Sequence, residues 1–96
     1  AKKMGGQAIL ENGGLVSLYL SGTLVTDEHL KALRGLTRLR KLSLDSTEVG
    51  DLGMQHVSTL ASLSELSLKD TAVSAAGVAK LAALRLLTSL RLNNTL

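Results

Sequence analysis

Leucine recurs every 24 residues along most of this chain, and no other feature of the sequence constrains the fold as strongly. Three leucine columns keep this spacing through four successive units: Leu15, Leu39, Leu63 and Leu87; Leu18, Leu42, Leu66 and Leu90; and Leu20, Leu44, Leu68 and Leu92. A threonine column (Thr23, Thr47, Thr71 and Thr95) and a valine column (Val25, Val49 and Val73) accompany them. A period of this length is typical of repeated units that stack to bury a common core.

Each unit has two parts with different periodicities. The first alternates apolar and polar residues, as in Leu18-Tyr19-Leu20, which is typical of a short strand with one buried face. The second places apolar residues three positions apart, as at Leu30, Leu33 and Leu36, which predicts one buried stripe of a short helix. Residue types suited to a helix N-terminus precede the stripes at one aligned position: Thr26, Gly50 and Ser74. The sequence therefore predicts an α/β fold with four parallel strands and about three helices.

The unit, L-x-x-L-x-L-x-x-T-x-V, resembles the leucine-rich repeat. Val25–Leu30, Val49–Met54 and Val73–Val78 are similar to the segment that follows the strand in the cysteine-containing, F-box-associated subfamily, with Thr in place of its Cys or Asn. The resemblance covers residues 15–96. It implies a right-handed α/β solenoid with short parallel strands on one face and helices on the other, and it says little about function.

The repeat divides the chain into segments. We expect three full units at residues 15–38, 39–62 and 63–86, followed by a terminal strand within 87–96. Residues 1–14 depart from the pattern, and Gln7–Asn12 is interpreted as the remnant helix of an earlier unit or an N-terminal tail. No polar capping unit is evident at either end. The chain is therefore expected to be a piece of a longer array that self-associates through uncapped ends.

The threonine column predicts a ladder of buried hydroxyls that bond loop backbone groups of their own and adjacent units. No base lies beside these hydroxyls in the repeat, which disfavours a nucleophilic role. The chain has no cysteine, no phosphate-binding glycine loop and no nucleophile elbow, and its only histidines are His29 and His56. We therefore expect no enzyme activity, no cofactor and no metal site.

Other partner classes are disfavoured by composition. The pI of about 9.6 permits nucleic-acid binding, but Tyr19 is the only aromatic residue available to stack on bases. No apolar run approaches the roughly 20 residues that span a bilayer. No secretory signal is evident, and the compartment is not fixed by the sequence, with an intracellular location favoured.

A protein-binding surface is the most productive prediction. Residues between the strand leucines should point outward, and Tyr19 and Arg91 stand out among them because tyrosine and arginine are enriched at binding hot spots. Charge also separates by edge, with six of the eight acidic residues in the loops after strands and at the starts of helices. Helix dipoles account for part of this separation. They leave unexplained a basic cluster suited to an acidic protein surface: Arg38, Arg40 and Lys41.

We therefore predict a protein–protein interaction module, with Tyr19, Arg38, Arg40, Lys41 and Arg91 as candidate contact residues. One alternative is a substrate-receptor repeat of an F-box-type ubiquitin-ligase complex, which only the resemblance suggests. Another is a structural spacer without a ligand of its own. An adaptor domain upstream of Ala1 in a longer chain would favour the first alternative, and featureless strand residues in neighbouring units would favour the second.

Overall fold

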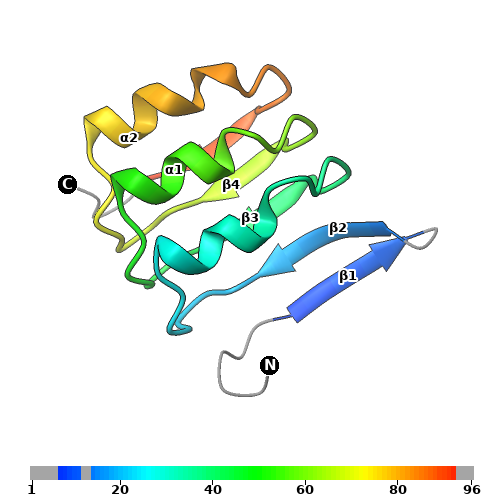
Figure 1. The fold of residues 1–96 in the computed structure, drawn as a ribbon, viewed down its shortest axis with the longest axis horizontal. Helices are drawn as coiled ribbons and strands as arrows, with labels where there is room; N and C mark the ends of the chain where they lie inside the picture. Colours follow the sequence, from blue (N-terminus) through cyan, green and yellow to red (C-terminus); the bar gives the residue numbers. More distant parts are fainter. Residues whose placement is uncertain (1–6, 12–13, 93–96) are drawn as a thin grey trace.

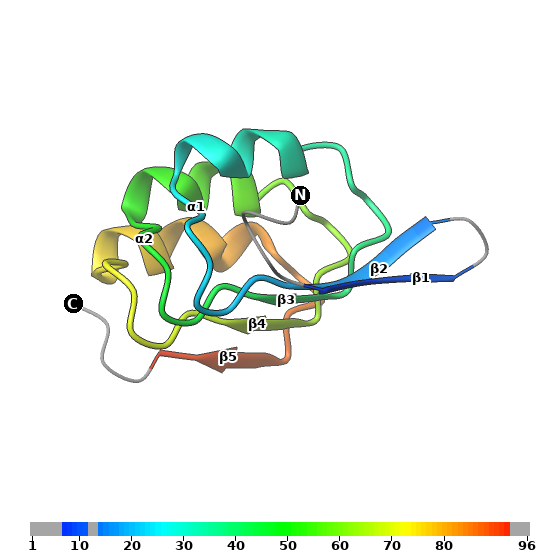
Figure 2. The same cartoon turned by 90° about the horizontal axis from the view of Figure 1, so that it is seen from below.

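A single mixed sheet carries the fold, with helical segments packed on one of its faces (Figures 1 and 2). The computed structural model describes residues 7–11 and 14–92, and within them the strand order follows the sequence, β1-β2-β3-β4-β5. The structure is α/β, as predicted. Within the described residues, none of the helices has the length and apolar character needed to cross a membrane.

The elements alternate along the chain after an initial pair of strands. In order they are β1 (Gln7–Glu11), β2 (Gly14–Tyr19), the 3₁₀ helix η1 (Glu28–Leu33), β3 (Lys41–Ser43), α1 (Asp51–Val57), β4 (Glu65–Ser67), α2 (Ala75–Lys80), the 3₁₀ helix η2 (Leu81–Ala83) and β5 (Ser89–Arg91). Strands β2 to β5 are parallel, as predicted, and their register follows the repeat: Leu18 pairs with Leu42, Leu42 with Leu66, and Leu66 with Leu90. Equivalent residues of successive units are therefore neighbours in space.

The prediction of a remnant helix at Gln7–Asn12 is wrong where the structure describes it. Gln7–Glu11 form strand β1, which pairs antiparallel with β2, so that Ala8 faces Leu18; Asn12 lies outside the described residues. A short apolar run does not by itself distinguish helix from strand. The sequence between the strands is Asn12-Gly13, the dipeptide most typical of a two-residue hairpin. The edge of β2 that was expected to be uncovered is therefore occupied by β1.

The described side chains of the leucine and valine columns form the core between the sheet and the helices. The two central units are buried most completely: Leu39, Leu44, Val49, Leu63 and Leu68 have no exposed surface. The predicted N-caps Gly50 and Ser74 are confirmed for α1 and α2, whereas η1 follows Asp27 rather than Thr26. Tertiary burial rather than capping therefore stabilises these short helices, since no cap side chain bonds its own helix.

The threonine hydroxyls are bonded, but within their own units. Thr47 and Thr71 are buried and donate to the carbonyls of Leu44 and Leu68 at 2.6 and 2.7 Å, and half-buried Thr23 donates to Leu20 at 2.7 Å. Bonds from these hydroxyls to adjacent units are absent among the described residues, so that part of the predicted ladder is wrong, and Thr95 lies outside them. The threonines close the turn after each strand instead.

The same turn needs one residue in the left-handed region of backbone space. Gly22, Ser46 and Asp70 occupy equivalent positions in the three units and have φ of 70°, 57° and 57°. Only Gly22 reaches this conformation without the steric cost of a side chain. The repeat thus imposes one turn geometry even where the residue type disfavours it.

One aspartate of the preceding unit bonds the N-cap residue of each α-helix, a contact called here the aspartate brace. Asp27 Oδ1 accepts the backbone N–H of Gly50 at 2.6 Å, and Asp51 Oδ1 accepts that of Ser74 at 2.7 Å. The Ser74 hydroxyl also donates to Asp51 Oδ2 at 2.5 Å. Hydrogen bonds from the Ser74 side chain and backbone hold the pKa of the Asp51 carboxyl below its usual range. These carboxylates therefore link adjacent units.

Candidate functional site

The sheet face opposite the helices carries the candidate site. All the helical segments lie on one side of the sheet, and the other side of β2 to β5 faces away from them (Figure 2). Register aligns the outward side chains in rows across the strands, one row being Ser17, Lys41, Glu65 and Ser89 and the next being Tyr19, Ser43, Ser67 and Arg91. Side chains from four strands therefore share this surface.

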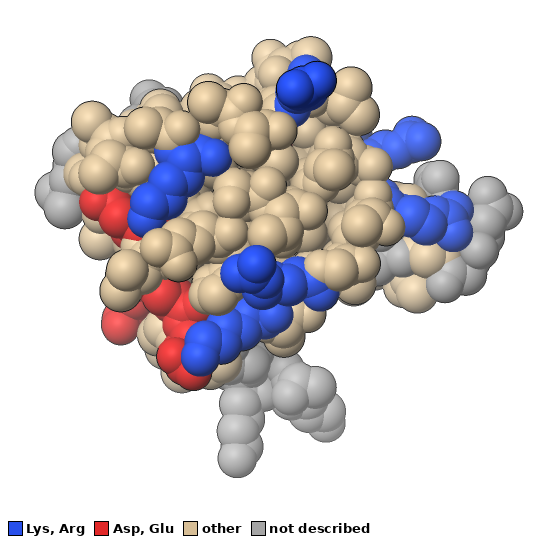
Figure 3. Space-filling model, turned by 45° about the horizontal axis from the view of Figure 1, so that its top comes forward, with Lys and Arg blue, Asp and Glu red and all other residues tan. Residues whose placement is uncertain are grey.

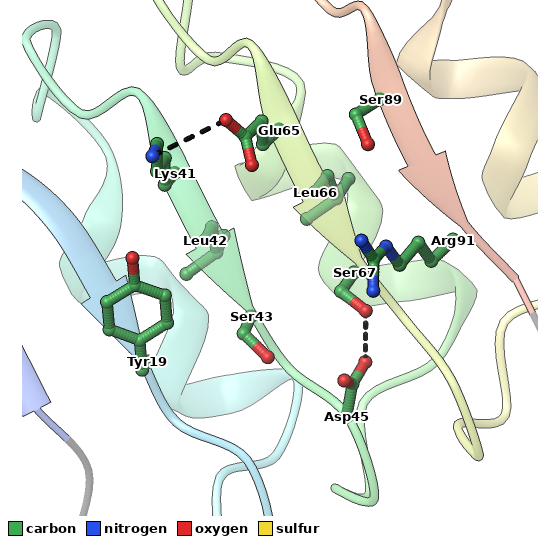
Figure 4. Close-up of a pocket in the computed structure, with 10 residues that line it drawn as sticks. All are labelled: Tyr19, Lys41, Leu42, Ser43, Asp45, Glu65, Leu66, Ser67, Ser89 and Arg91. Carbon is green, nitrogen blue, oxygen red and sulfur yellow. Dashed lines mark hydrogen bonds and ion pairs between the residues drawn. The ribbon is translucent and has the colours of Figure 1, made fainter.

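Apart from Ser17, which is buried, the side chains of both rows line an open hollow of about 240 Å³ (Figure 4). Its lining residues come from β2 to β5 and the turn after β3: Tyr19, Lys41, Leu42, Ser43, Asp45, Glu65, Leu66, Ser67, Ser89 and Arg91. The row of Tyr19, Ser43, Ser67 and Arg91 explains the shape, because the two central strands contribute small serines between two large side chains. Pockets for small organic ligands usually measure about 300–1,000 Å³, so this hollow is smaller.

Polar bonds fix one side of the hollow. Asp45 Oδ1 accepts the Ser67 hydroxyl at 2.6 Å and the backbone N–H of Lys69 at 2.8 Å. On the other side the Lys41 ammonium lies 3.5 Å from the Glu65 carboxylate, with the two side chains 48 % and 52 % exposed. A pair this exposed contributes about 1 kcal/mol or less. Three of the charged lining residues, Asp45, Lys41 and Glu65, are therefore already partnered within the chain.

Tyr19 and Arg91 differ from these lining residues in their polar contacts. Neither the Tyr19 hydroxyl nor the Arg91 guanidinium makes a hydrogen bond or ion pair within residues 7–11 and 14–92. Figure 4 shows the Arg91 side chain extending from β5 over the Ser67 region and the Tyr19 ring standing at the opposite side of the hollow. Tyr19 is half-buried and Arg91 is exposed. The hollow therefore has hydrogen-bonding groups at both ends that the described chain leaves unused.

The structure brings three of the five predicted contact residues together. Tyr19, Lys41 and Arg91 line the hollow, whereas Arg38 and Arg40 do not. The Arg38 guanidinium packs over the backbone of β2, where a Cβ added to Gly14 would lie 2.7 Å from one of its terminal nitrogens. Arg40 is exposed, and its backbone N–H bonds Val16 in the neighbouring strand. The predicted basic cluster is therefore divided between the edge before β3 and the strand face.

Two charged lining residues were not among the predicted contacts. Asp45 and Glu65 both occupy outward positions of the repeat, and the register places Glu65 directly beside Lys41. Aligning the units would have revealed this opposite-charge pair. The positions of Asp45 and Ser67 in the sequence do not reveal their hydrogen bond, because this bond requires the turn after β3 to place Asp45 beside β4.

On the face drawn in Figure 3, the acidic side chains lie toward the edge where the helices begin, and basic side chains lie beside them, in the middle and toward the opposite edge. Both histidines contact other residues of the chain: His29 Nδ1 accepts the backbone N–H of Thr26 at 3.0 Å, and His56 Nδ1 lies 3.0 Å from a nitrogen of Arg34 in the preceding unit. No cluster of three or more potential metal-ligating acids and histidines occurs in the described part of the chain.

Comparison with known proteins does not place the chain in a family. No protein-family model matches it, and no curated protein is significantly similar to it in sequence. The functional argument therefore rests on the geometry of the strand face.

Proposed function

We propose that this chain is a leucine-rich-repeat solenoid that binds another protein through its strand face. The leucine-rich-repeat interpretation is supported by the parallel register, in which the three paired residues of each strand face their equivalents 24 positions later. Hydrogen bonds between turns recur with the same spacing: Leu20, Leu44 and Leu68 each donate a backbone N–H to the next strand, at 2.8 to 2.9 Å. Each layer therefore stacks on its neighbour in one repeating manner.

The observation that carries the function is the hollow between Tyr19 and Arg91. It lies on the uncovered face of the sheet, and it carries two side chains of the types that dominate binding energy at protein interfaces. Both retain unused hydrogen-bonding capacity within the described residues. A solvated spacer has no need for large side chains placed at the two ends of a floor of serines.

Size favours a protein over a small molecule as the partner. The hollow of about 240 Å³ is too small and too open to enclose a drug-sized ligand, but it suits one or two side chains of a larger surface. Partnered charges at its border, such as Lys41 with Glu65, resemble the polar rim of an interface. The partner that these observations favour is therefore another protein.

Site-specific photocrosslinking tests this proposal. A small aliphatic diazirine amino acid, much smaller than an indole, replaces Ser89, which lines the hollow and whose hydroxyl makes no hydrogen bond within the described residues, and the matched control replaces exposed Gln55 on α1. In a lysate of the cells that make the protein, we expect a discrete adduct from position 89 that excess unlabelled chain prevents.

The control at position 55, on the helix face, should give no adduct whose formation is prevented by excess unlabelled chain. Competable adducts from position 55 alone would move the recognition surface to the helices. Their absence from both positions would support the structural spacer.

A further inference from the structure

One charged side chain of the strand-face hollow has no partner among the described residues. Each of the other three charged lining residues has a partner: Asp45 Oδ1 receives Ser67 and the backbone of Lys69, and Glu65 Oε2 faces Lys41. The strongest donor of the hollow, the Arg91 guanidinium, makes no bond within the described residues, and neither does the Tyr19 hydroxyl. The group left to a partner molecule is therefore a cationic donor, and a negatively charged acceptor complements it.

We propose that the hollow receives the carboxylate of an acidic side chain from the partner protein, with Arg91 as its anchor. An arginine fork matches a carboxylate with two parallel N–H···O bonds, which gives orientation as well as binding energy. Tyr19 marks the other end of the same row and offers one hydroxyl and an apolar ring. This inference rests on the proposed function, because it specifies the chemistry of the partner at the same surface.

Row geometry indicates how the partner lies. Tyr19 and Arg91 belong to β2 and β5, which are separated by three strand spacings of about 4.8 Å each, with only the Ser43 and Ser67 side chains between them in that row. An extended segment that crosses the strands spans this distance in about four residues. Its acidic residue lies at Arg91, and an apolar residue a few positions away lies on the Tyr19 ring.

Local charge does not oppose this assignment. The nearest acids to the row are Asp45 and Glu65, and both are matched by donors or a cation of the chain itself. The chain as a whole has a net charge of +3. A second copy of the chain could also offer acids, from the edge where its helices begin, and the experiment below distinguishes that source.

A library of random 12-residue peptides is the probe. It is selected against the wild-type chain, and dissociation constants of the selected peptides are measured for wild type, Arg91→Gln and the matched control Arg85→Gln, an exposed arginine outside the hollow. We expect selected peptides to share an Asp or Glu. Arg91→Gln should weaken them roughly 10- to 100-fold, the range for a hydrogen bond between charged groups, and Arg85→Gln should not.

Changing the shared acid of a selected peptide to its amide completes the cycle. This change should weaken binding to wild type by a similar factor and have little further effect on Arg91→Gln, because both changes remove the same contact. Peptides without an acid, or acidic peptides indifferent to Arg91→Gln, would overturn the carboxylate assignment.

Ser89→Trp separates this failure from failure of the proposed function. The substitution places an indole in the hollow without removing a hydrogen bond made within the described residues. If the selected peptides contain no acid and Ser89→Trp abolishes their binding, the strand face is a binding surface but the carboxylate proposal is wrong. If no selected peptide loses its binding to Ser89→Trp, both the carboxylate proposal and the proposed function are wrong. Concentration-dependent dimers that Arg91→Gln abolishes would identify a second copy as the source of the acid.

Discussion

Replacing Gly77 by alanine tests whether the aspartate brace sets the spacing between units. Gly77 is buried in α2, and a Cβ at this position would overlap Asp51 Oδ1 and approach Val73 Cγ1 to 3.0 Å. The Asp51 carboxylate cannot turn aside without losing its bonds to the backbone and hydroxyl of Ser74. The substitution therefore sets a gain in helix propensity against a steric conflict between two units.

The steric conflict should be the larger of the two effects. Alanine in place of glycine favours a helix interior by about 1 kcal/mol. Overpacking a buried position costs about 1–3 kcal/mol. We expect Gly77→Ala to lower the free energy of unfolding by up to about 2 kcal/mol, although the same change in an unconstrained helix is stabilising.

Urea unfolding followed by circular dichroism measures the effect in two backgrounds. In the Asp51→Ala background the overlapping oxygen is gone, so Gly77→Ala should become neutral or raise the urea midpoint. Ala76→Gly, at the exposed neighbouring position, provides the control for helix propensity alone. A loss of stability from Gly77→Ala that is equal in both backgrounds would refute the role assigned to Asp51.

Three further perturbations test other parts of the structure. Leu44→Ala should lower the free energy of unfolding by about 2–5 kcal/mol in the same urea assay, because Leu44 is fully buried in a central unit, and an unchanged midpoint would contradict the strand register. Thr47→Val should cost about 1–3 kcal/mol by leaving the Leu44 carbonyl without its donor, with a smaller loss for half-buried Thr23→Val, and equal losses would contradict the burial argument. The pKa of the Asp51 carboxyl is lowered in the folded state, so its contribution to stability is present above the ordinary carboxyl pKa and is lost as pH falls through the lowered value. Urea midpoints measured from about pH 6 to about pH 2 should therefore fall more for wild type than for Asp51→Asn. Parallel curves for the two proteins would contradict the role assigned to the Asp51 carboxylate.

The sequence predicts the burial and orientation of residues at repeated positions. It does not predict features that depend on one particular contact. The leucine columns specify which side chains are buried, because a strand period of two and a regular spacing leave one consistent arrangement. The same logic identified the outward positions, including Tyr19, Lys41 and Arg91. Projecting the repeat back onto Gln7–Glu11 failed because those residues pair through a hairpin, whose signal is the local Asn12-Gly13 rather than the period.

The hydrogen bonds that fix individual side chains cannot be predicted from the periodic pattern. The bond between Asp45 and Ser67 and the brace between Asp51 and Ser74 join residues 22 and 23 positions apart. The chain between the two partners of each contact includes a turn with a left-handed residue, Ser46 in the first and Asp70 in the second, which residue type alone does not indicate. Their partners became identifiable only after the turn had fixed where each carboxylate points.

Duplicating residues 39–62 tests most directly the central claim that the chain is a stack of equivalent units. In the longer protein, Asp51 of the first copy would meet Gly50 and Gly53 of the second, as Asp27 meets those glycines here. A matched control inserts the same residues in shuffled order.

The measurement is the urea unfolding curve. A stack of units with nearest-neighbour interfaces predicts one cooperative transition with a higher midpoint and a steeper dependence on urea than the parent, since an interior unit adds buried surface. A lower midpoint, or a broad transition like that of the shuffled control, would contradict the claim.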